Sequence, residues 1–157
     1  MMRRLIVDAN ILALLVVGNQ AKTLVSKHKR TRKYTSEDHD LLEYFLSDYD
    51  ELVLMPNTVT ETSNLLRHGL EEHVTAFARH LEKIVVAHTE QVVASCDAVK
   101  EHGYTWLGVT DAAILNLLRV SPRLALLTDD LDLYLAASKG GGDAHNFTHL
   151  REQAGIL

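Results

Sequence analysis

Acidic residues follow two of the short apolar segments that have the length and character of buried strands. Asp8 comes directly after residues 5–7, and Asp129 and Asp130 come just after residues 124–127. In open parallel sheets the carboxyl ends of the strands meet at one edge, and ligands bind there. We therefore expect these carboxylates to lie close together at that edge of a sheet.

Two further acids, Glu61 and Asp111, stand in the first turns of predicted helices, and each follows a threonine. Helices that follow strands begin at the same sheet edge, so these acids are expected to face the same cleft. A single acid at a helix N-terminus is ordinarily a partner of the helix dipole. Four carboxylates brought together repel one another and raise one another's pKa unless a cation lies between them. Oxygen ligands without clustered Cys or His favour Mg²⁺ or Mn²⁺ over zinc. The predicted metal ligands are Asp8, Glu61, Asp111 and one of the neighbours Asp129 and Asp130.

The elements that position these acids follow from the apolar periodicity, which alternates between strand-length runs and helical patterns. Strands are predicted at 5–7, 52–55, 124–127 and, weakly, 145–148. Asn10 is the expected cap of the first helix and Thr110 that of a later one. The predicted helices are 10–17, 36–46, 57–68, 70–86, 90–102, 111–120 and 131–138. This alternation predicts an α/β fold with a central parallel sheet, in one domain over residues 1–157.

The composition is that of a globular chain, with 46% hydrophobic residues, a net charge of −5 and one cysteine among 157 residues. No apolar run approaches the roughly 20 residues that span a bilayer, so we expect no membrane segment. Cys96 cannot form an internal disulfide, and we expect it to be a small buried side chain in a reducing cytoplasm.

One segment of the chain is strongly basic although the protein as a whole is acidic. Six of the sixteen Lys and Arg residues fall between positions 22 and 33, with no acid among them. They form either a solvated loop or a clamp for the RNA backbone beside the acidic cleft. An acidic cleft needs nearby cations to admit a polyanion, which favours the clamp. These basic-segment residues are Lys22, Lys27, Lys29, Arg30, Arg32 and Lys33.

Four segments, taken in order, resemble the acidic motifs of PIN-domain ribonucleases. They are Leu-Ile-Val-Asp-Ala-Asn at 5–10, Pro-Asn-Thr-Val-Thr-Glu-Thr-Ser-Asn-Leu-Leu at 56–66, Thr-Asp-Ala-Ala-Ile at 110–114 and Leu-Leu-Thr-Asp-Asp-Leu-Asp-Leu at 126–133. The resemblance implies a three-layer α/β/α sandwich that cleaves RNA phosphodiester bonds with Mg²⁺ or Mn²⁺.

The resemblance implies a role for each residue that matches a position of the family's motifs. The three acids found most regularly in the family match Asp8, Glu61 and Asp111. The family's Thr-x-Asp pattern places the fourth at Asp130, with Asp129 as an alternative and Asp132 as a further candidate. Asn10 and Thr128 match polar positions that hydrogen-bond and orient the acids.

The leading hypothesis is therefore a metal-dependent endoribonuclease. A metal-bound water would attack phosphorus in line and leave a 5′-phosphate and a 3′-hydroxyl, as the resemblance implies. Small members of the family are toxins that act beside an antitoxin, which here would be expected to insert a basic side chain among the acids. The resemblance also makes a homodimer plausible.

Two alternatives from other classes remain open. One is a catalytically silent PIN-like adaptor that binds RNA or protein. The other is a phosphotransfer domain of the receiver or haloacid-dehalogenase phosphatase type, since both place acids at strand ends. The phosphatase needs Asp-x-Asp after its first strand, but the residue two after Asp8 is Asn10. The receiver needs paired acids after that strand, and these are absent.

Overall fold

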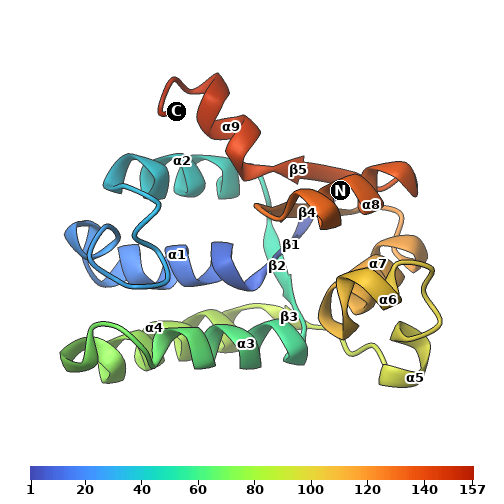
Figure 1. Cartoon of the computed structure of the whole chain (residues 1–157), viewed down its shortest axis with the longest axis horizontal. Helices are drawn as coiled ribbons and strands as arrows, with labels where there is room; N and C mark the ends of the chain where they lie inside the picture. The colour runs from blue at the N-terminus through green and yellow to red at the C-terminus, as the bar shows by residue number, and fades with distance from the viewer.

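The computed structural model describes residues 1–157 and is built around a five-stranded parallel sheet (Figure 1). The strand order is β3-β2-β1-β4-β5, so β1 is the central strand, and every neighbouring pair is parallel. The strands are β1 (Arg4–Val7), β2 (Glu51–Leu54), β3 (Thr89–Glu90), β4 (Leu124–Thr128) and β5 (Asp143–Asn146). The predicted α/β fold with a central parallel sheet is confirmed.

Helices connect these strands and follow the last of them. They are α1 (Ala9–Gln20), α2 (Ser36–Leu46), α3 (Pro56–Leu66), α4 (Val74–Ala87), α5 (Ser95–Ala98), α6 (Tyr104–Leu107), α7 (Val109–Val120), α8 (Leu131–Lys139) and α9 (Phe147–Gln153). Two short 3₁₀ helices, η1 (Lys22–Leu24) and η2 (Glu71–His73), precede α2 and α4. No helix has the length and apolar character needed to cross a membrane.

The sheet is covered by helices on both faces because its side chains alternate between two apolar cores. In β1, Leu5 and Val7 join the larger core with α1, α2, α3 and α4. Ile6, between them, joins the second core with α7 and α8. All three side chains are at most 2% exposed. This arrangement is the three-layer α/β/α sandwich that the sequence resemblance implied.

The helix that follows β1 is capped differently from the prediction. Asp8 is its N-cap and accepts a hydrogen bond from the Ile11 backbone N–H at 3.1 Å, whereas Asn10 lies exposed in the first turn. The expected cap at Thr110 is also wrong, because α7 begins two residues earlier than predicted, at Val109, and its N-cap is Gly108. Gly108 has φ +89°, a conformation that a residue with a Cβ rarely adopts.

The region between α4 and α7 differs most from the prediction. The helix expected at 90–102 is absent, and its place is taken by the two-residue strand β3, an extended segment and α5. Strand β3 pairs with β2 through Val53 and Leu54. A strand this short carries no periodic signal that distinguishes it from a helix. Cys96 lies in α5 and is exposed, not buried as expected.

Candidate active site at the carboxyl edge of the sheet

The candidate site lies where the connections from the two central strands diverge. The chain leaves β1 toward β2 on one side and leaves β4 toward β5 on the other, so β1 and β4 flank the topological switch point at which parallel sheets bind ligands. The two carboxyl ends are joined, because the Asp8 N–H donates to the Leu127 carbonyl at 3.2 Å. Asp8 and the 128–130 segment are therefore held together by the sheet ladder.

Asp8 is a buried carboxylate, 8% exposed, held by three donors. Its Oδ1 accepts from the Ile11 N–H, and its Oδ2 accepts from the Thr128 hydroxyl and, at 3.3 Å, from the Asp129 N–H. Burial raises the pKa of Asp8 to about 6 although these hydrogen bonds act in the opposite direction. The carboxylate therefore has a fixed orientation, but no basic side chain pairs with its negative charge.

Thr128 links two of the predicted acids. Its fully buried hydroxyl donates to Asp8 Oδ2 and accepts from the Asp130 N–H at 3.0 Å. Asn10, the other residue expected to orient the acids, makes no side-chain hydrogen bond and is exposed. The helix cap that Asn10 was expected to supply is supplied by Asp8 itself.

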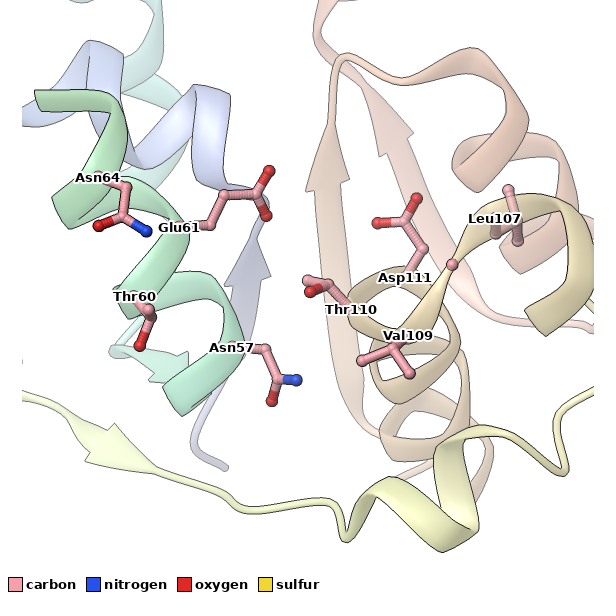
Figure 2. A pocket seen from close by; sticks show the side chains of 9 residues that line it. Asn57, Thr60, Glu61, Asn64, Leu107, Val109, Thr110 and Asp111 are labelled. Atoms are coloured by element: carbon pink, nitrogen blue, oxygen red, sulfur yellow. The ribbon is translucent and has the colours of Figure 1, made fainter. Parts of the chain in front are cut away.

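Glu61 and Asp111 face each other across a cleft of about 460 Å³ between α3 and α7 (Figure 2). Asp111 is half-buried, whereas Glu61 is exposed. The pKa of Asp111 is raised to about 7, chiefly by burial and then by the charges of Asp130, Asp8 and Glu61, in that order. The structure thus brings the four predicted acids close enough for each of the other three to act on Asp111.

The α3 wall of the cleft is a polar stripe, which we define as Asn57, Thr60, Glu61 and Asn64. These positions follow the i, i+3, i+4, i+7 spacing of one helix face, and the buried residues Thr58, Thr62 and Leu66 lie on the other. The opposite wall is formed by residues 107–111. The sequence analysis assigned only Glu61 from this stripe. Helical spacing from Glu61 is the signal that could have found the other three.

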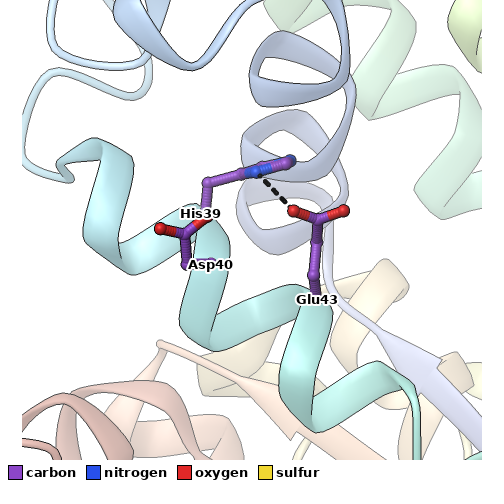
Figure 3. A group of neighbouring side chains, drawn as sticks. All are labelled: His39, Asp40 and Glu43. Carbon is purple, nitrogen blue, oxygen red and sulfur yellow. Dashed lines mark ion pairs between the residues drawn. The ribbon is translucent and has the colours of Figure 1, made fainter.

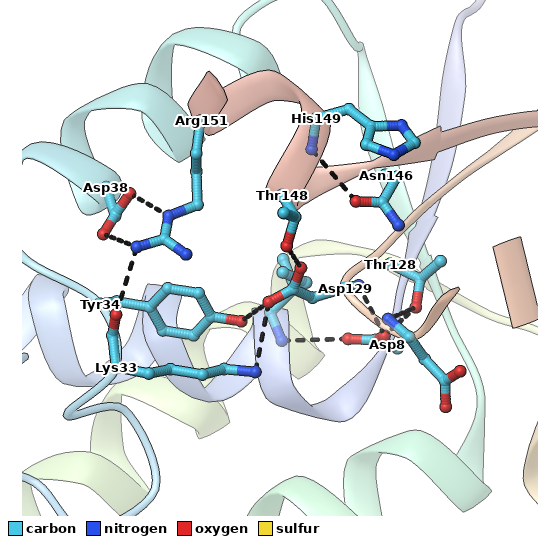
Figure 4. A network of polar contacts seen from close by, with 12 residues as sticks. Asp8, Lys33, Tyr34, Asp38, Thr128, Asp129, Asn146, Thr148, His149 and Arg151 are labelled. Atoms are coloured by element: carbon cyan, nitrogen blue, oxygen red, sulfur yellow. Dashed lines mark hydrogen bonds and ion pairs between the residues drawn. The ribbon is translucent and has the colours of Figure 1, made fainter. Parts of the chain in front are cut away.

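The side chain of Asp129 makes its contacts outside the cleft (Figure 4). Its carboxylate accepts hydrogen bonds from the Tyr34 hydroxyl at 2.5 Å and from the Thr148 hydroxyl, and the Lys33 ammonium lies 3.2 Å away. Burial alone raises the pKa of Asp129, but Thr148, Tyr34 and Lys33 outweigh it and lower the pKa below its usual value. The side chain of Asp129 is therefore occupied within the protein.

Asp130 is exposed and caps α8, where its Oδ1 accepts from the Asp132 and Leu133 N–H groups at 2.9 and 3.1 Å. The charge of Asp130 helps to raise the pKa of Asp111, whereas the charge of Asp129 does not. Asp132 lies exposed in the first turn of α8, and its side chain makes no hydrogen bond or ion pair. Of the two neighbouring alternatives, Asp130 is the one whose charge acts on Asp111, whereas the charge of Asp129 acts on Asp8.

The basic segment divides into paired and unpaired cations. Lys22 pairs with Asp40 and Glu43 of α2, and Lys33 pairs with Asp129. The Lys33 contact places the end of the segment against the loop that follows β4. The remaining four cations are exposed and form no ion pair; they are Lys27, Lys29, Arg30 and Arg32.

The donor set of the cleft fits a hydrated hard cation. All four ligand candidates are carboxylates, and no basic side chain forms an ion pair with Asp8, Glu61, Asp111 or Asp130. No three of these carboxylates present oxygens that all lie within 4.8 Å of one another. Mg²⁺ ordinarily keeps several waters and binds through one or two carboxylates. The spacing of the acids therefore suits an ion that keeps part of its water shell.

Comparison with known proteins identifies the architecture. No family model and no curated protein matches the chain. The crystal structure of PAE2754 from Pyrobaculum aerophilum is similar to it, with a TM-score of 0.56 and 18% sequence identity over 100% of this chain and 98% of that one. At this identity the similarity establishes the fold, a three-layer α/β/α sandwich with a parallel sheet.

Proposed function

We propose that this protein is a metal-dependent endoribonuclease of the PIN-domain type, which hydrolyses RNA phosphodiester bonds in the cleft between α3 and α7. The observation that carries the proposal is the placement of Asp8, Glu61, Asp111 and Asp130 around one edge of the sheet, close enough for the charges of the other three to raise the pKa of Asp111. Negative charge from four separate segments accumulates along this edge. Such an accumulation is costly unless a cation offsets it.

The ion would be Mg²⁺ or Mn²⁺, bound directly by one or two of Asp8, Glu61, Asp111 and Asp130 and through water by the others. When bound, it would lower the pKa of a water molecule and neutralise charge on the phosphate oxygens. Thr128 and the Asp129 N–H hold Asp8 in one orientation, so this ligand needs no reorganisation. Glu61 is exposed and free to adjust to the substrate, whereas Asp130 is exposed but held at the N-cap of α8 through its Oδ1.

Two parts of the surface would bind the RNA strand. In the polar stripe, the amides of Asn57 and Asn64 and the hydroxyl of Thr60 supply uncharged donors and acceptors suited to ribose and base edges. The four unpaired cations of the basic segment, Lys27, Lys29, Arg30 and Arg32, would contact phosphates. Each phosphate contact releases counterions and makes binding salt-dependent.

A narrower proposal is that the nuclease is a cytoplasmic toxin with a partner antitoxin. The uncompensated carboxylates of the cleft would favour a partner that inserts a basic side chain among them. Co-purification from the native host tests this partner. Light scattering of the purified chain tests the proposed homodimer, which would bring two clefts together.

The decisive experiment is cleavage of single-stranded RNA by the purified chain with Mn²⁺. Asp111→Asn should abolish cleavage and weaken Mn²⁺ binding, measured by calorimetry. Asp48→Asn is the matched control, because Asp48 is an exposed acid outside the cleft, and it should retain both properties. Cleavage by Asp111→Asn at the wild-type rate would contradict the proposal. RNA binding without cleavage by the Mn²⁺-loaded wild-type chain would favour the adaptor.

A further inference from the structure

A second group of metal-ligand side chains lies on α2, outside the acidic cleft (Figure 3). His39 Nδ1 and one carboxylate oxygen each from Asp40 and Glu43 all lie within 4.8 Å of one another. It is the one such group in residues 1–157. We call it the His39 cluster.

The imidazole of His39 is held in a fixed position by α1. The residue is 1% exposed, and its ring occupies the space beside Gly18, where a Cβ would lie 2.0 Å from His39 Cδ2. Glycine inside a helix is unfavourable compared with alanine. The glycine at this position is what lets the ring pack against the helix backbone, so the ring nitrogens have defined directions.

The neighbours of the two ring nitrogens fit one tautomer of His39. Nε2 lies 3.2 Å from the Asn19 amide oxygen, which accepts from the tautomer that carries its proton on Nε2 and a lone pair on Nδ1. Nδ1 lies 3.2 Å from Glu43 Oε1 but is a buried atom without a hydrogen-bond partner. In that tautomer Nδ1 and Glu43 Oε1 are both acceptors, with no donor between them. Histidines that bind metals usually donate their other N–H to an oxygen in this way.

A cation already lies against the carboxylates of the cluster. The Lys22 ammonium contacts Asp40 and lies 3.6 Å from Glu43 Oε1. Lys22 neutralises the acids but cannot satisfy Nδ1, because that atom is not among its contacts. A divalent ion would bind the two carboxylates and the imidazole together.

We propose that His39, Asp40 and Glu43 form a Zn²⁺ site in which Lys22 is an intramolecular competitor. An imidazole nitrogen with carboxylate oxygens is a ligand set that zinc accepts, with bonds of about 2.0–2.2 Å, whereas Mg²⁺ prefers oxygen alone. Water completes the coordination, since the site lies at the surface and both carboxylates are exposed. Zinc binding releases Lys22 from α2 and adds it to the unpaired cations of the basic segment.

The test is calorimetric titration with ZnCl₂ in the Asp111→Asn background, which disables the acidic cleft and so separates this site from the proposed nuclease. We expect one Zn²⁺ per chain. Glu43→Gln should weaken binding at least tenfold, and Glu37→Gln, an exposed acid of the same helix outside the cluster, should leave it unchanged. Lys22→Met should strengthen binding, because it removes the competing ammonium.

Nitrogen NMR identifies the coordinating atom. Zn²⁺ should shift the Nδ1 resonance of His39 and leave Nε2 protonated. The proposal is overturned if the Asp111→Asn chain binds no Zn²⁺, if Glu43→Gln binds it with unchanged affinity, or if Lys22→Met weakens binding. It is also overturned if the Nδ1 resonance does not respond, which would assign His39 to helix packing alone.

Discussion

The Tyr34 hydroxyl donates a 2.5 Å hydrogen bond to Asp129 Oδ2 and so ties the segment between α1 and α2 to the loop after β4. The residues lie 95 positions apart in sequence, and the Tyr34 ring is fully buried against Phe147. The backbone N–H of Asp129 in turn donates to Asp8. Tyr34 therefore supports the orientation of Asp8 through two hydrogen bonds in series.

Tyr34→Phe should destabilise the fold, because it leaves the Asp129 carboxylate without one of its donors. A hydrogen bond to a charged group contributes about 1.5–3 kcal/mol to stability, and urea unfolding should show a loss in this range. The control is Tyr44→Phe, since the side chain of Tyr44 is 76% exposed. Equal stabilities of the two variants would contradict the supporting role of Tyr34.

Thr128→Val should raise the pKa of Asp8 above about 6, because the charged carboxylate loses a donor. Carbon NMR titration of the Asp8 carboxyl measures the change directly. Thr58→Val is the matched control, because the Thr58 hydroxyl is buried without a partner and its loss should not destabilise the fold. An unchanged Asp8 pKa in Thr128→Val would show that Thr128 does not hold the carboxylate.

Stability should fall as the pH rises from about 4 to 7 in the absence of divalent ions. Asp8 and Asp111 have raised pKa values of about 6 and 7, so the folded chain keeps protons that the unfolded chain has lost. For Asp8 the loss is about 3 kcal/mol at 1.36 kcal/mol for each pKa unit. Below pH 4 the lowered pKa of Asp129 acts in the opposite direction, because protonation breaks its contacts.

Unfolding experiments at a series of pH values test this profile. Asp111→Asn should reduce the fall in folding stability between pH 4 and 7. Mn²⁺ should stabilise the wild-type chain more at pH 7.5 than at pH 5. A stability that rises steadily from pH 4 to 7 without metal would contradict the charge accumulation on which the proposed metal site depends.

Arg151→Met should be strongly destabilising. The guanidinium binds the fully buried carboxylate of Asp38 through two hydrogen bonds of 2.6 and 3.1 Å. Removing one partner of a buried pair costs about 3–5 kcal/mol. The exposed pair of Arg79 and Glu82 provides the control, since Arg79→Met should change stability by less than about 1 kcal/mol. Adding Asp38→Asn to Arg151→Met should recover part of the loss. Thermal unfolding of the wild type, Arg151→Met, Asp38→Asn and the double variant gives the coupling.

Gly18→Ala should destabilise the chain although alanine favours helices, because its Cβ would overlap the His39 ring. Overpacking of this kind costs about 1–3 kcal/mol. Gly140→Ala is the control, since a Cβ there would meet its neighbours at 3.5 Å or more. Adding His39→Ala should remove the overlap. If chemical unfolding shows that the double variant is no more stable than expected from the two single substitutions, the His39 ring is not the reason that position 18 requires glycine.

The strand-end acids could be predicted from the sequence because each strand is an unbroken apolar run and the next polar residue marks its end. Asp8 was placed in this way, and Asp130 was chosen over Asp129 from the Thr-x-Asp pattern of the family resemblance. The direction of Asp129 could not be predicted, because it depends on Tyr34 and Thr148, which come from segments of weak periodicity. Asn10 was misassigned because both Asp and Asn cap helices well, and the sequence does not show which of them stands at the boundary.

The polar stripe and the His39 cluster were missed for different reasons. Helical spacing from Glu61 is enough to find Asn57, Thr60 and Asn64, but none of the three carries a charge that would mark it as a ligand. The His39 cluster depends on how α1 packs against α2. Gly18 and Asn19 lie 20 or more positions before His39, and no local pattern pairs them with it.

The capping role of Asp8 has a practical consequence for trapping a complex with uncleaved substrate. Asparagine caps helices about as well as aspartate, so Asp8→Asn keeps the acceptor for the Ile11 N–H. The Thr128 hydroxyl can rotate to accept from the new amide, and the Asp129 N–H loses the acceptor that it has at 3.3 Å. The substitution removes the buried charge without removing the start of α1. This variant is therefore the natural choice for cocrystallisation with an intact oligonucleotide.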